Sequence, residues 1–278
     1  MEQRKNCFFV KIIITIIIIL IFTPFLFSLF DEGTKGNIKT DKKGEKTKEI
    51  LLVDYSFKSN EDRNVTKRYT FENEGNYRIC IYGAKAINGG KGGLQCALHS
   101  FKKNDTLLFY FEGRKSGGKG GKKCGFWYRR DGNDGAGMAR VIRKNYKDFE
   151  IIAGGGGGSS ESNKNEGGDA EQNGKGKFGG NGAKNSTFYG KKGDWDAKDG
   201  TKYKGGDGGR GENWYNYCGG GGGNGYYGGG GGGYGNDETA GGGGGGSNYC
   251  NAAHCEISNI NNYEPYSGVK IFSKEKIK

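Results

Sequence analysis

The sequence predicts an all-β fold, an antiparallel β-sandwich interrupted by a glycine-rich insertion, on three observations. Residues 50–153 contain short apolar runs that are separated by turn residues and show no helical periodicity. Of the chain's 58 glycines, 39 lie in residues 154–246. A last alternating run occupies residues 268–272. We therefore expect the chain to leave a sheet near Ala153 and to return to it near the C-terminus.

The N-terminal segment predicts the compartment. Residues 12–30 carry no charge and follow a short basic start. As a helix, this run is near the lower limit for spanning a hydrocarbon core of about 30 Å. We expect residues 1–30 to form one hydrophobic signal-anchor helix or a cleaved signal peptide, and Pro24 favours the second alternative. Both place residues 31–278 in the extracellular or lumenal space, membrane-anchored in the first case and secreted in the second.

Composition divides the rest of the chain. Residues 31–49 mix charges of both signs with almost no apolar content, which predicts a disordered stalk. The sandwich is expected in residues 50–153 and 260–273, and the glycine-rich insertion in residues 154–259. Apolar residues make up only 33% of the chain, so a conventional core cannot extend through all of it.

The strands are predicted from local patterns. Residues 76–82 alternate, with Ile79 and Ile81 on one face. Residues 106–111 and 149–153 are denser apolar runs of strand length. Glycines at the ends of these runs are typical of turns and of close backbone approach.

The insertion contains four uninterrupted glycine runs, at residues 154–158, 219–223, 228–233 and 241–246. Collagen is excluded because the segment has no sustained G-X-Y period and no proline. An extended helix with three residues per turn directs its backbone groups outward, and without side chains several such helices can hydrogen-bond to one another. We therefore expect an ordered bundle of polyglycine helices.

This expectation has a mutational form. Valine in place of Gly230 or Gly243 is expected to destabilise the domain, because a Cβ inside the bundle prevents close approach. Valine in place of Gly190, in a sparser and more polar stretch, is expected to be nearly silent.

Seven cysteines occur, and Cys7 precedes the apolar segment. The other six are an even number in a compartment that is expected to be oxidising, which predicts up to three disulfides. A local Cys250–Cys255 loop and a Cys218–Cys250 bridge both fit the spacing. The six candidates are Cys80, Cys96, Cys124, Cys218, Cys250 and Cys255.

Three sequons predict a glycoprotein, and their acceptors are Asn64, Asn104 and Asn185. The formal net charge is +12, and lysine is mixed with aspartate and glutamate. The compartment argues against nucleic acid as a partner. A solvated surface explains the charge, with attraction to an acidic polysaccharide or a membrane surface as the functional alternative.

Motifs for chemistry are weak. Residues 174–179 match G-x-G-x-x-G, but no strand precedes them and no helix follows. Cys250, His254 and Cys255 lack the paired spacing of a structural zinc site. We therefore expect no catalytic residue, no cofactor and no metal, and the chain is not expected to be an enzyme.

Several motifs occur in an order that points to a family. They are YTFENEG at residues 69–75, NYRICIYGA at 76–84, GGKGG at 89–93, KNDTL at 103–107, FEIIAGGGGG at 149–158 and SGVKI at 267–271. Together they resemble the extracellular glycine-rich domain of the anaplastic lymphoma kinase and leukocyte tyrosine kinase receptors, over about residues 66–273.

The resemblance implies a sandwich of tumour-necrosis-factor-like type with a bundle of polyglycine helices inserted, and a ligand-binding receptor ectodomain. The sequence departs from the receptors because it has no V-A-I-K, H-R-D or D-F-G motif, no EGF-like module and no second hydrophobic span. Signalling by phosphorylation is therefore not carried over.

We expect a receptor-like domain for ligand binding or adhesion at a membrane surface. Its ligand is an unidentified protein or polysaccharide, and the membrane is contacted through the N-terminal segment. Self-association into a homo-oligomer stays open. The alternative is a secreted structural glycine-rich coat or wall protein, in which the strand-rich half would have no obvious purpose.

Overall fold

The computed structural model describes residues 38–40, 46–57, 63–122, 124, 131–161, 165–184, 188–194, 196–211, 217–236, 238–256 and 266–276. The chain divides into two compact units, Met1–Glu49 with Glu275–Lys278, and Ile50–Lys274. The hydrophobic helix expected in residues 1–30 lies outside the described residues. The expected disordered stalk contains strand structure, because β1 (Ile38–Thr40) pairs with the start of β2 (Lys46–Phe57).

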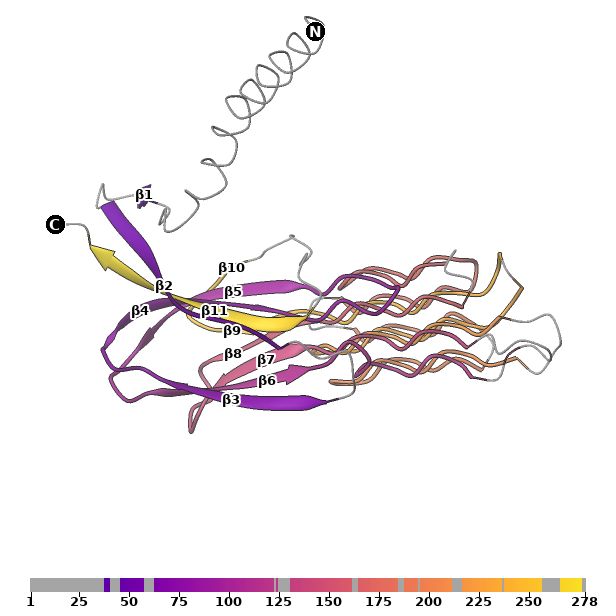
Figure 1. Ribbon diagram of the computed structural model, residues 1–278, viewed down its shortest axis with the longest axis horizontal. Helices are drawn as coiled ribbons and strands as arrows, with labels where there is room; N and C mark the ends of the chain where they lie inside the picture. Colours follow the sequence, from indigo (N-terminus) through magenta and orange to yellow (C-terminus); the bar gives the residue numbers. More distant parts are fainter. Residues whose placement is uncertain are drawn as a thin grey trace, which may run out of the picture. The chain divides into compact units, whose positions relative to one another are not determined.

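The larger unit contains two antiparallel sheets, so the all-β sandwich is confirmed (Figure 1). One sheet runs in the order β2-β11-β4-β5-β10, and the other in the order β3-β6-β7-β8-β9. The strands of the first sheet after β2 are β4 (Gly75–Tyr82), β5 (Leu94–Phe101), β10 (His254–Glu256) and β11 (Ser267–Lys276). The strands of the second sheet are β3 (Asn64–Thr70), β6 (Thr106–Glu112), β7 (Ala139–Arg143), β8 (Glu150–Ala153) and β9 (Tyr249–Asn251).

The sandwich core fills the space between the two sheets. Every second residue of β6 is buried, which directs Leu107, Phe109 and Phe111 inward. Fully buried Ile79 and Ile271, on β4 and β11, belong to the same cluster. Each buried side chain of this size contributes roughly 1.5–3 kcal/mol, so side-chain burial stabilises this half of the unit.

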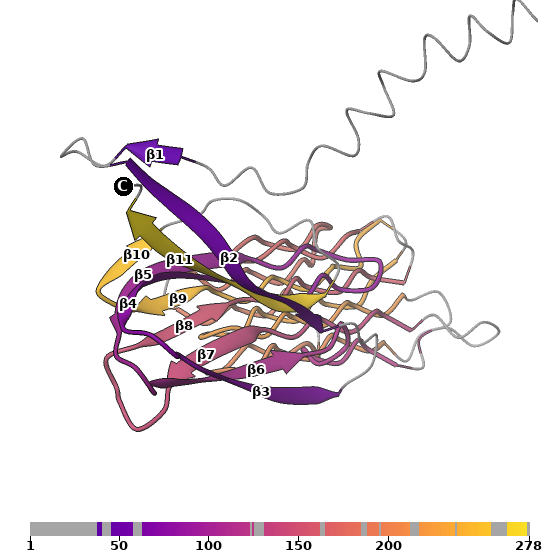
Figure 2. The same cartoon turned by 60° about the vertical axis from the view of Figure 1, so that its left-hand side comes forward.

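The glycine-rich half extends from one end of the sandwich as chain segments that lie side by side (Figures 1 and 2). We call these segments the glycine bundle. It differs from the predicted insertion in two ways. The β4–β5 connection, residues 83–93, and the described parts of the β6–β7 connection, residues 113–122, 124 and 131–138, also belong to it through hydrogen bonds such as Gly90 N to Gly157 O at 2.8 Å. Strands β9 and β10, which were assigned to the insertion, belong to the sandwich instead.

Hydrogen bonds in the bundle repeat every three residues. In residues 219–224, Gly219 and Gly222 donate to residues 206–209, Gly220 and Gly223 to residues 241–244, and Gly221 and Asn224 to residues 133–136. The carbonyl groups follow the same three-residue rule. Gly219 and Gly222 accept from residues 118–121, Gly220 and Gly223 accept from residues 229–232, and Gly221 and Asn224 accept from residues 155–158. This run therefore has six neighbouring segments, each contacted twice.

Most of these positions need glycine because there is no room for a side chain, and not because of an unusual backbone conformation. Among the described glycines only Gly176 has a positive φ, at 92°. A Cβ added to Gly222 would lie 2.0 Å from the carbonyl oxygen of Gly229. A Cβ added to Gly190 would lie 2.1 Å from Asn181 O, so the expectation that Gly190→Val is nearly silent is wrong. Gly190 donates to Gly228 O at 2.9 Å and is part of the bundle despite its polar surroundings.

Aromatic and polar contacts join the bundle to the sandwich. Tyr226 of the bundle stacks on Tyr249 of β9 with ring centroids 4.0 Å apart. Asn224 Nδ2 donates to Glu112 Oε2 at 2.8 Å, and that oxygen also accepts from Met138 N at 2.9 Å. Glu112 is the last residue of β6, so its carboxylate ties a glycine run directly to the sheet.

Three disulfides involve the six cysteines that follow the apolar segment. Cys80–Cys96 joins directly paired positions of β4 and β5. Cys124–Cys218 joins two bundle segments, and Cys250–Cys255 joins β9 to β10 and hence one sheet to the other. The alternative Cys218–Cys250 bridge is therefore wrong.

Candidate ligand-binding site

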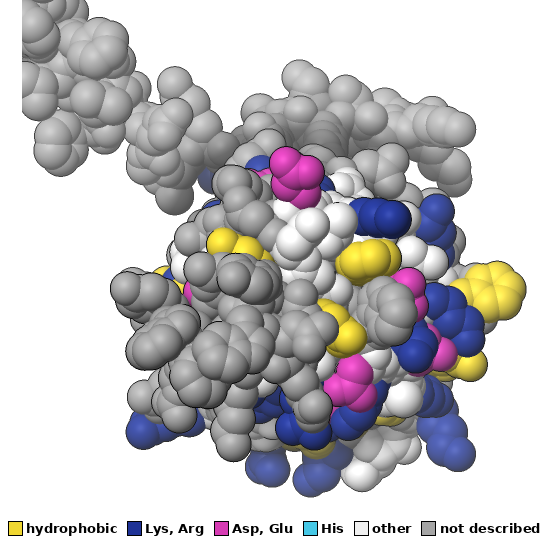
Figure 3. Space-filling model, turned by 90° about the vertical axis from the view of Figure 1, so that its right-hand side faces the viewer, with side chains coloured by type: hydrophobic (Ala, Val, Ile, Leu, Met, Phe, Trp, Pro, Cys, Tyr) yellow, Lys and Arg dark blue, Asp and Glu magenta, His cyan; other side chains and the backbone are white. Residues whose placement is uncertain are grey.

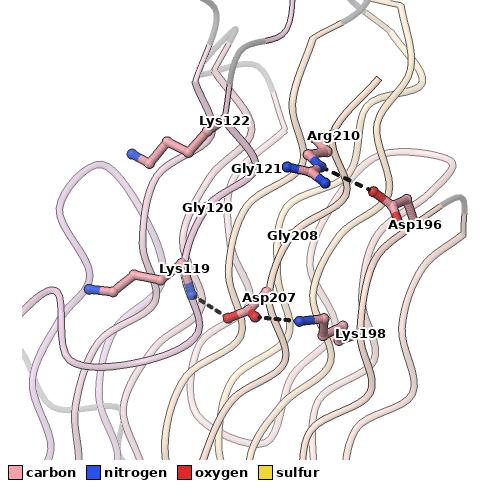
Figure 4. Close-up of a pocket in the computed structure, with 9 residues that line it drawn as sticks. All are labelled: Lys119, Gly120, Gly121, Lys122, Asp196, Lys198, Asp207, Gly208 and Arg210. Carbon is pink, nitrogen blue, oxygen red and sulfur yellow. Dashed lines mark hydrogen bonds and ion pairs between the residues drawn. The ribbon is translucent and has the colours of Figure 1, made fainter. Parts of the chain in front are cut away.

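The candidate site is a pocket of about 300 Å³ on the surface of the glycine bundle (Figure 4). Six charged residues and three glycines line it. They are Lys119, Lys122, Asp196, Lys198, Asp207 and Arg210, with Gly120, Gly121 and Gly208.

Two segments with the same pattern build the pocket. Residues 117–121 and 205–209 read GGKGG and GGDGG. Gly208 N donates to Lys119 O at 2.8 Å, and Lys119 N donates to Asp207 Oδ1 at 3.0 Å, so the two segments lie side by side. Their glycines pair with inner runs, for example Gly121 N with Gly219 O at 2.9 Å. The non-glycine residue in each pattern carries its side chain on the outer side of the bundle, where Figure 4 shows it at the pocket.

The lining carries four cationic groups and two carboxylates, a formal charge of 4 − 2 = +2. Lys198 Nζ lies 3.1 Å from Asp207 Oδ2, and Arg210 Nε lies 3.6 Å from Asp196 Oδ2. The other two cations pair with carboxylates that do not line the pocket: Lys119 Nζ lies 3.4 Å from Asp134 Oδ2, and Lys122 Nζ lies 3.8 Å from Asp131 Oδ2. The Arg210 side chain is 72% exposed, and ion pairs at such exposure are worth about 0–1 kcal/mol, so a ligand can compete for these cations at little cost.

Asp207 is fixed in its ionised form. Burial raises the pKa of its carboxyl, but the hydrogen bonds from Lys119 N and Lys198 Nζ, together with the positive charges of Lys198 and Lys204, hold that pKa below its ordinary value. This carboxylate therefore stays charged at neutral pH and holds the Lys119 backbone and the Lys198 side chain in place.

This arrangement is suited to binding an anion. Flexible ammonium groups and a guanidinium surround a floor of backbone, and these groups form the strongest hydrogen bonds with carboxylate, sulfate and phosphate oxygens. Seen from the bundle end, the described Lys and Arg side chains lie interspersed with Asp and Glu (Figure 3). In the described ranges, no group of three or more His, Cys, Asp and Glu residues is placed to hold a metal.

The sequence-predicted site residues lie elsewhere. Asn64 at the start of β3 and Asn104 in the β5–β6 turn are both exposed, as glycosylation requires. Asn185 lies outside the described residues. None of the six cysteines lines the pocket.

Sequence reasoning missed the pocket residues. The signal that marks them is the G-G-x-G-G pattern, in which x is charged, at residues 117–121 and 205–209. Uninterrupted glycine runs have neighbours on every side, whereas a segment with one charged residue in each turn leaves that side to solvent.

Comparison with known proteins finds no family model and no curated sequence that matches the chain. No helix in the part of the chain that the structure describes is long and apolar enough to cross a membrane. The apolar run at residues 12–30 lies outside that part.

Proposed function

We propose that this chain is an extracytoplasmic, receptor-like domain for ligand binding or adhesion, with the glycine bundle as the rigid part that presents the binding site. The observation that carries the proposal is the charged pocket, which is preformed on a hydrogen-bonded backbone scaffold. Because Gly120, Gly121 and Gly208 pack against backbone, the pocket floor has no side chain that must reorder when a ligand binds.

Three further features support the proposal. The three disulfides are compatible with an oxidising, extracellular or lumenal location. The three-residue repeat of hydrogen bonds supports the interpretation of the bundle segments as polyglycine helices. The two antiparallel sheets are compatible with a tumour-necrosis-factor-like sandwich and with the resemblance to the receptor ectodomains. Attachment to a membrane or release from it depends on residues 1–30.

The proposal is tested with the purified full-length chain in detergent. Light scattering after gel filtration is expected to give a discrete species, and an immobilised anionic polymer is expected to bind it saturably. Growth into concentration-dependent polymers, without saturable binding, would show a structural coat or wall protein instead.

A further inference from the structure

Charged residues of the pocket recur every three residues along the bundle surface. Lys119 and Lys122 are three residues apart on one segment, and Asp207 and Arg210 are three apart on the segment beside it. Both segments keep the three-residue hydrogen-bond repeat, since Gly118 and Gly121 donate to one run and Gly206 and Gly209 to another. Residues three apart therefore face the same side, roughly 9 Å apart along the segment.

Two carboxylates lie among these cations, and they limit the chemical class of ligand that fits the pocket. Asp207 accepts hydrogen bonds from the backbone amide of Lys119 and from Lys198 Nζ, and Asp196 lies beside Arg210 (Figure 4). A ligand with carboxylates alone is partly repelled by these two groups. A ligand that carries both acidic groups and hydroxyls pairs its acids with the cations and donates its hydroxyls to the carboxylates.

The lining also has no apolar side chain, because its residues are all charged or glycine. Peptide side chains and lipid tails gain little there from burial. The Lys198 and Arg210 side chains are 71% and 72% exposed, so the site is open enough for a polymer to pass along it.

We infer that this pocket binds a linear acidic polysaccharide, a sugar polymer with repeated carboxylate or sulfate groups. The inference rests on the proposed binding function and names its ligand. The sugar acids would contact Lys122 and Arg210, which lie at the same level on the two neighbouring segments, and Asp196 and Asp207 would accept hydroxyl hydrogen bonds.

The test compares two charge-reversal pairs in the full-length chain. Lys122→Glu with Arg210→Glu changes the pocket, and Lys175→Glu with Lys191→Glu makes the same charge change at exposed lysines elsewhere on the bundle. Kd is measured on surfaces of heparin, hyaluronate, neutral dextran and poly-L-glutamate. Heparin against hyaluronate distinguishes sulfate from carboxylate.

The pocket pair is expected to weaken binding to at least one acidic polysaccharide about 30-fold, and the control pair less than about threefold. Wild type is expected not to bind dextran, and to bind poly-L-glutamate at least about tenfold more weakly than the acidic polysaccharide. If the reversed pair fails to fold, Lys122→Ala with Arg210→Ala is expected to weaken binding about tenfold. Unchanged circular dichroism and Tm identify the folded variants.

Equal losses for the two reversal pairs would overturn the inference, because the attraction would then be unspecific. The inference would also be overturned if wild type bound poly-L-glutamate as tightly as it binds the polysaccharides and the pocket pair lost that binding. The proposed binding function would still stand in that case. Failure of all four surfaces to bind a discrete, folded chain would contradict both.

Discussion

In the sandwich, side chains such as Ile79 and Phe111 fill the space between the sheets, whereas the buried runs of the glycine bundle have no side chain at all. The sandwich is stabilised mainly by removal of apolar surface from water. The bundle is stabilised by backbone hydrogen bonds such as Gly222 N to Gly206 O at 2.8 Å. Each such bond contributes a net of only about 1 kcal/mol, and each glycine loses much entropy on ordering.

This difference predicts that the two halves respond in opposite ways to changes in side-chain size. Removing atoms weakens the sandwich, because a cavity remains. Adding atoms weakens the bundle, because segments that touch through backbone cannot move apart on one side without breaking contacts on the others. The small gain for each bundle residue also makes cross-links and contacts with the sandwich more important there.

The largest effect is expected from an added side chain. A Cβ at Gly243 would lie 2.1 Å from Gly221 O, so Gly243→Val is expected to lower the free energy of unfolding by about 5 kcal/mol or more. Urea denaturation, monitored by circular dichroism, measures this change in the free energy of unfolding. The control is Gly75→Ala in β4, where the Cβ would lie 3.6 Å from Tyr77 Cε2 and the change is expected to stay within about 1 kcal/mol. A wild-type midpoint for Gly243→Val would contradict the packing of the bundle.

The disulfides give the second comparison. Cys124–Cys218 closes a sequence separation of 94 residues within the bundle, and Cys250–Cys255 closes one of 5 between the sheets. Loss of loop-closure entropy in the unfolded chain predicts a cost of about 4.6 kcal/mol for replacing the first pair by serine and about 2 kcal/mol for the second. Denaturation of the two double variants measures both, and a larger cost for the Cys250–Cys255 pair would contradict the role given to the long cross-link.

Shortening a side chain in the sandwich core is expected to have the next largest effect on stability. Ile79 is fully buried between the sheets, and Ile79→Ala is expected to cost about 3 kcal/mol through lost burial and the remaining cavity. Equilibrium unfolding in urea gives the value. A cost below about 1 kcal/mol would mean that the space between the sheets is loosely packed.

Local sequence patterns predicted the sandwich but only part of the bundle. The alternation at residues 76–82 corresponds to β4, and the apolar run at 106–111 to β6, because the face of a strand is encoded in successive residues. The short glycine clusters at 89–93 and 117–121 belong to the bundle although local patterns place them in the sandwich, because their partners, such as Gly157 and Gly222, are distant in sequence.

The pocket could not be predicted for the same reason. Lys119 and Asp207 meet only because two segments, 88 residues apart in the chain, are hydrogen-bonded to each other. Nothing local in either segment identifies its neighbour. The three-residue rule, once known, marks Lys119 and Asp207 as surface residues, but it does not say which segments lie side by side.

The smallest effect concerns the junction between the two halves. Burial raises the pKa of Glu112, its hydrogen bonds with Asn224 and Met138 lower it, and burial prevails. With a folded pKa above the unfolded one, ionisation is unfavourable in the folded state. Stability from this group is complete below the ordinary pKa of about 4.5 and is lost as the pH rises through the folded value. Glu112→Gln is expected to remove this loss, so that the variant is more stable than wild type at pH 7.

Urea titrations of wild type and Glu112→Gln between pH 4 and pH 8 measure the effect as a difference in slope. Identical pH profiles would show that the Glu112 carboxylate is not buried at the junction. Greater stability of wild type at pH 7 would mean that the ionised carboxylate is needed for its bonds to Asn224 and Met138.

Amide hydrogen exchange of the full-length chain tests the account of the bundle most directly. In residues 219–224 every amide donates to a neighbouring segment, and the run is buried. We expect these amides to exchange as slowly as those of β4 in the sandwich, since each opens only when the surrounding segments separate. Exchange of the glycine runs at the rate of an unstructured chain, with β4 still protected, would show that the bundle is not an ordered scaffold.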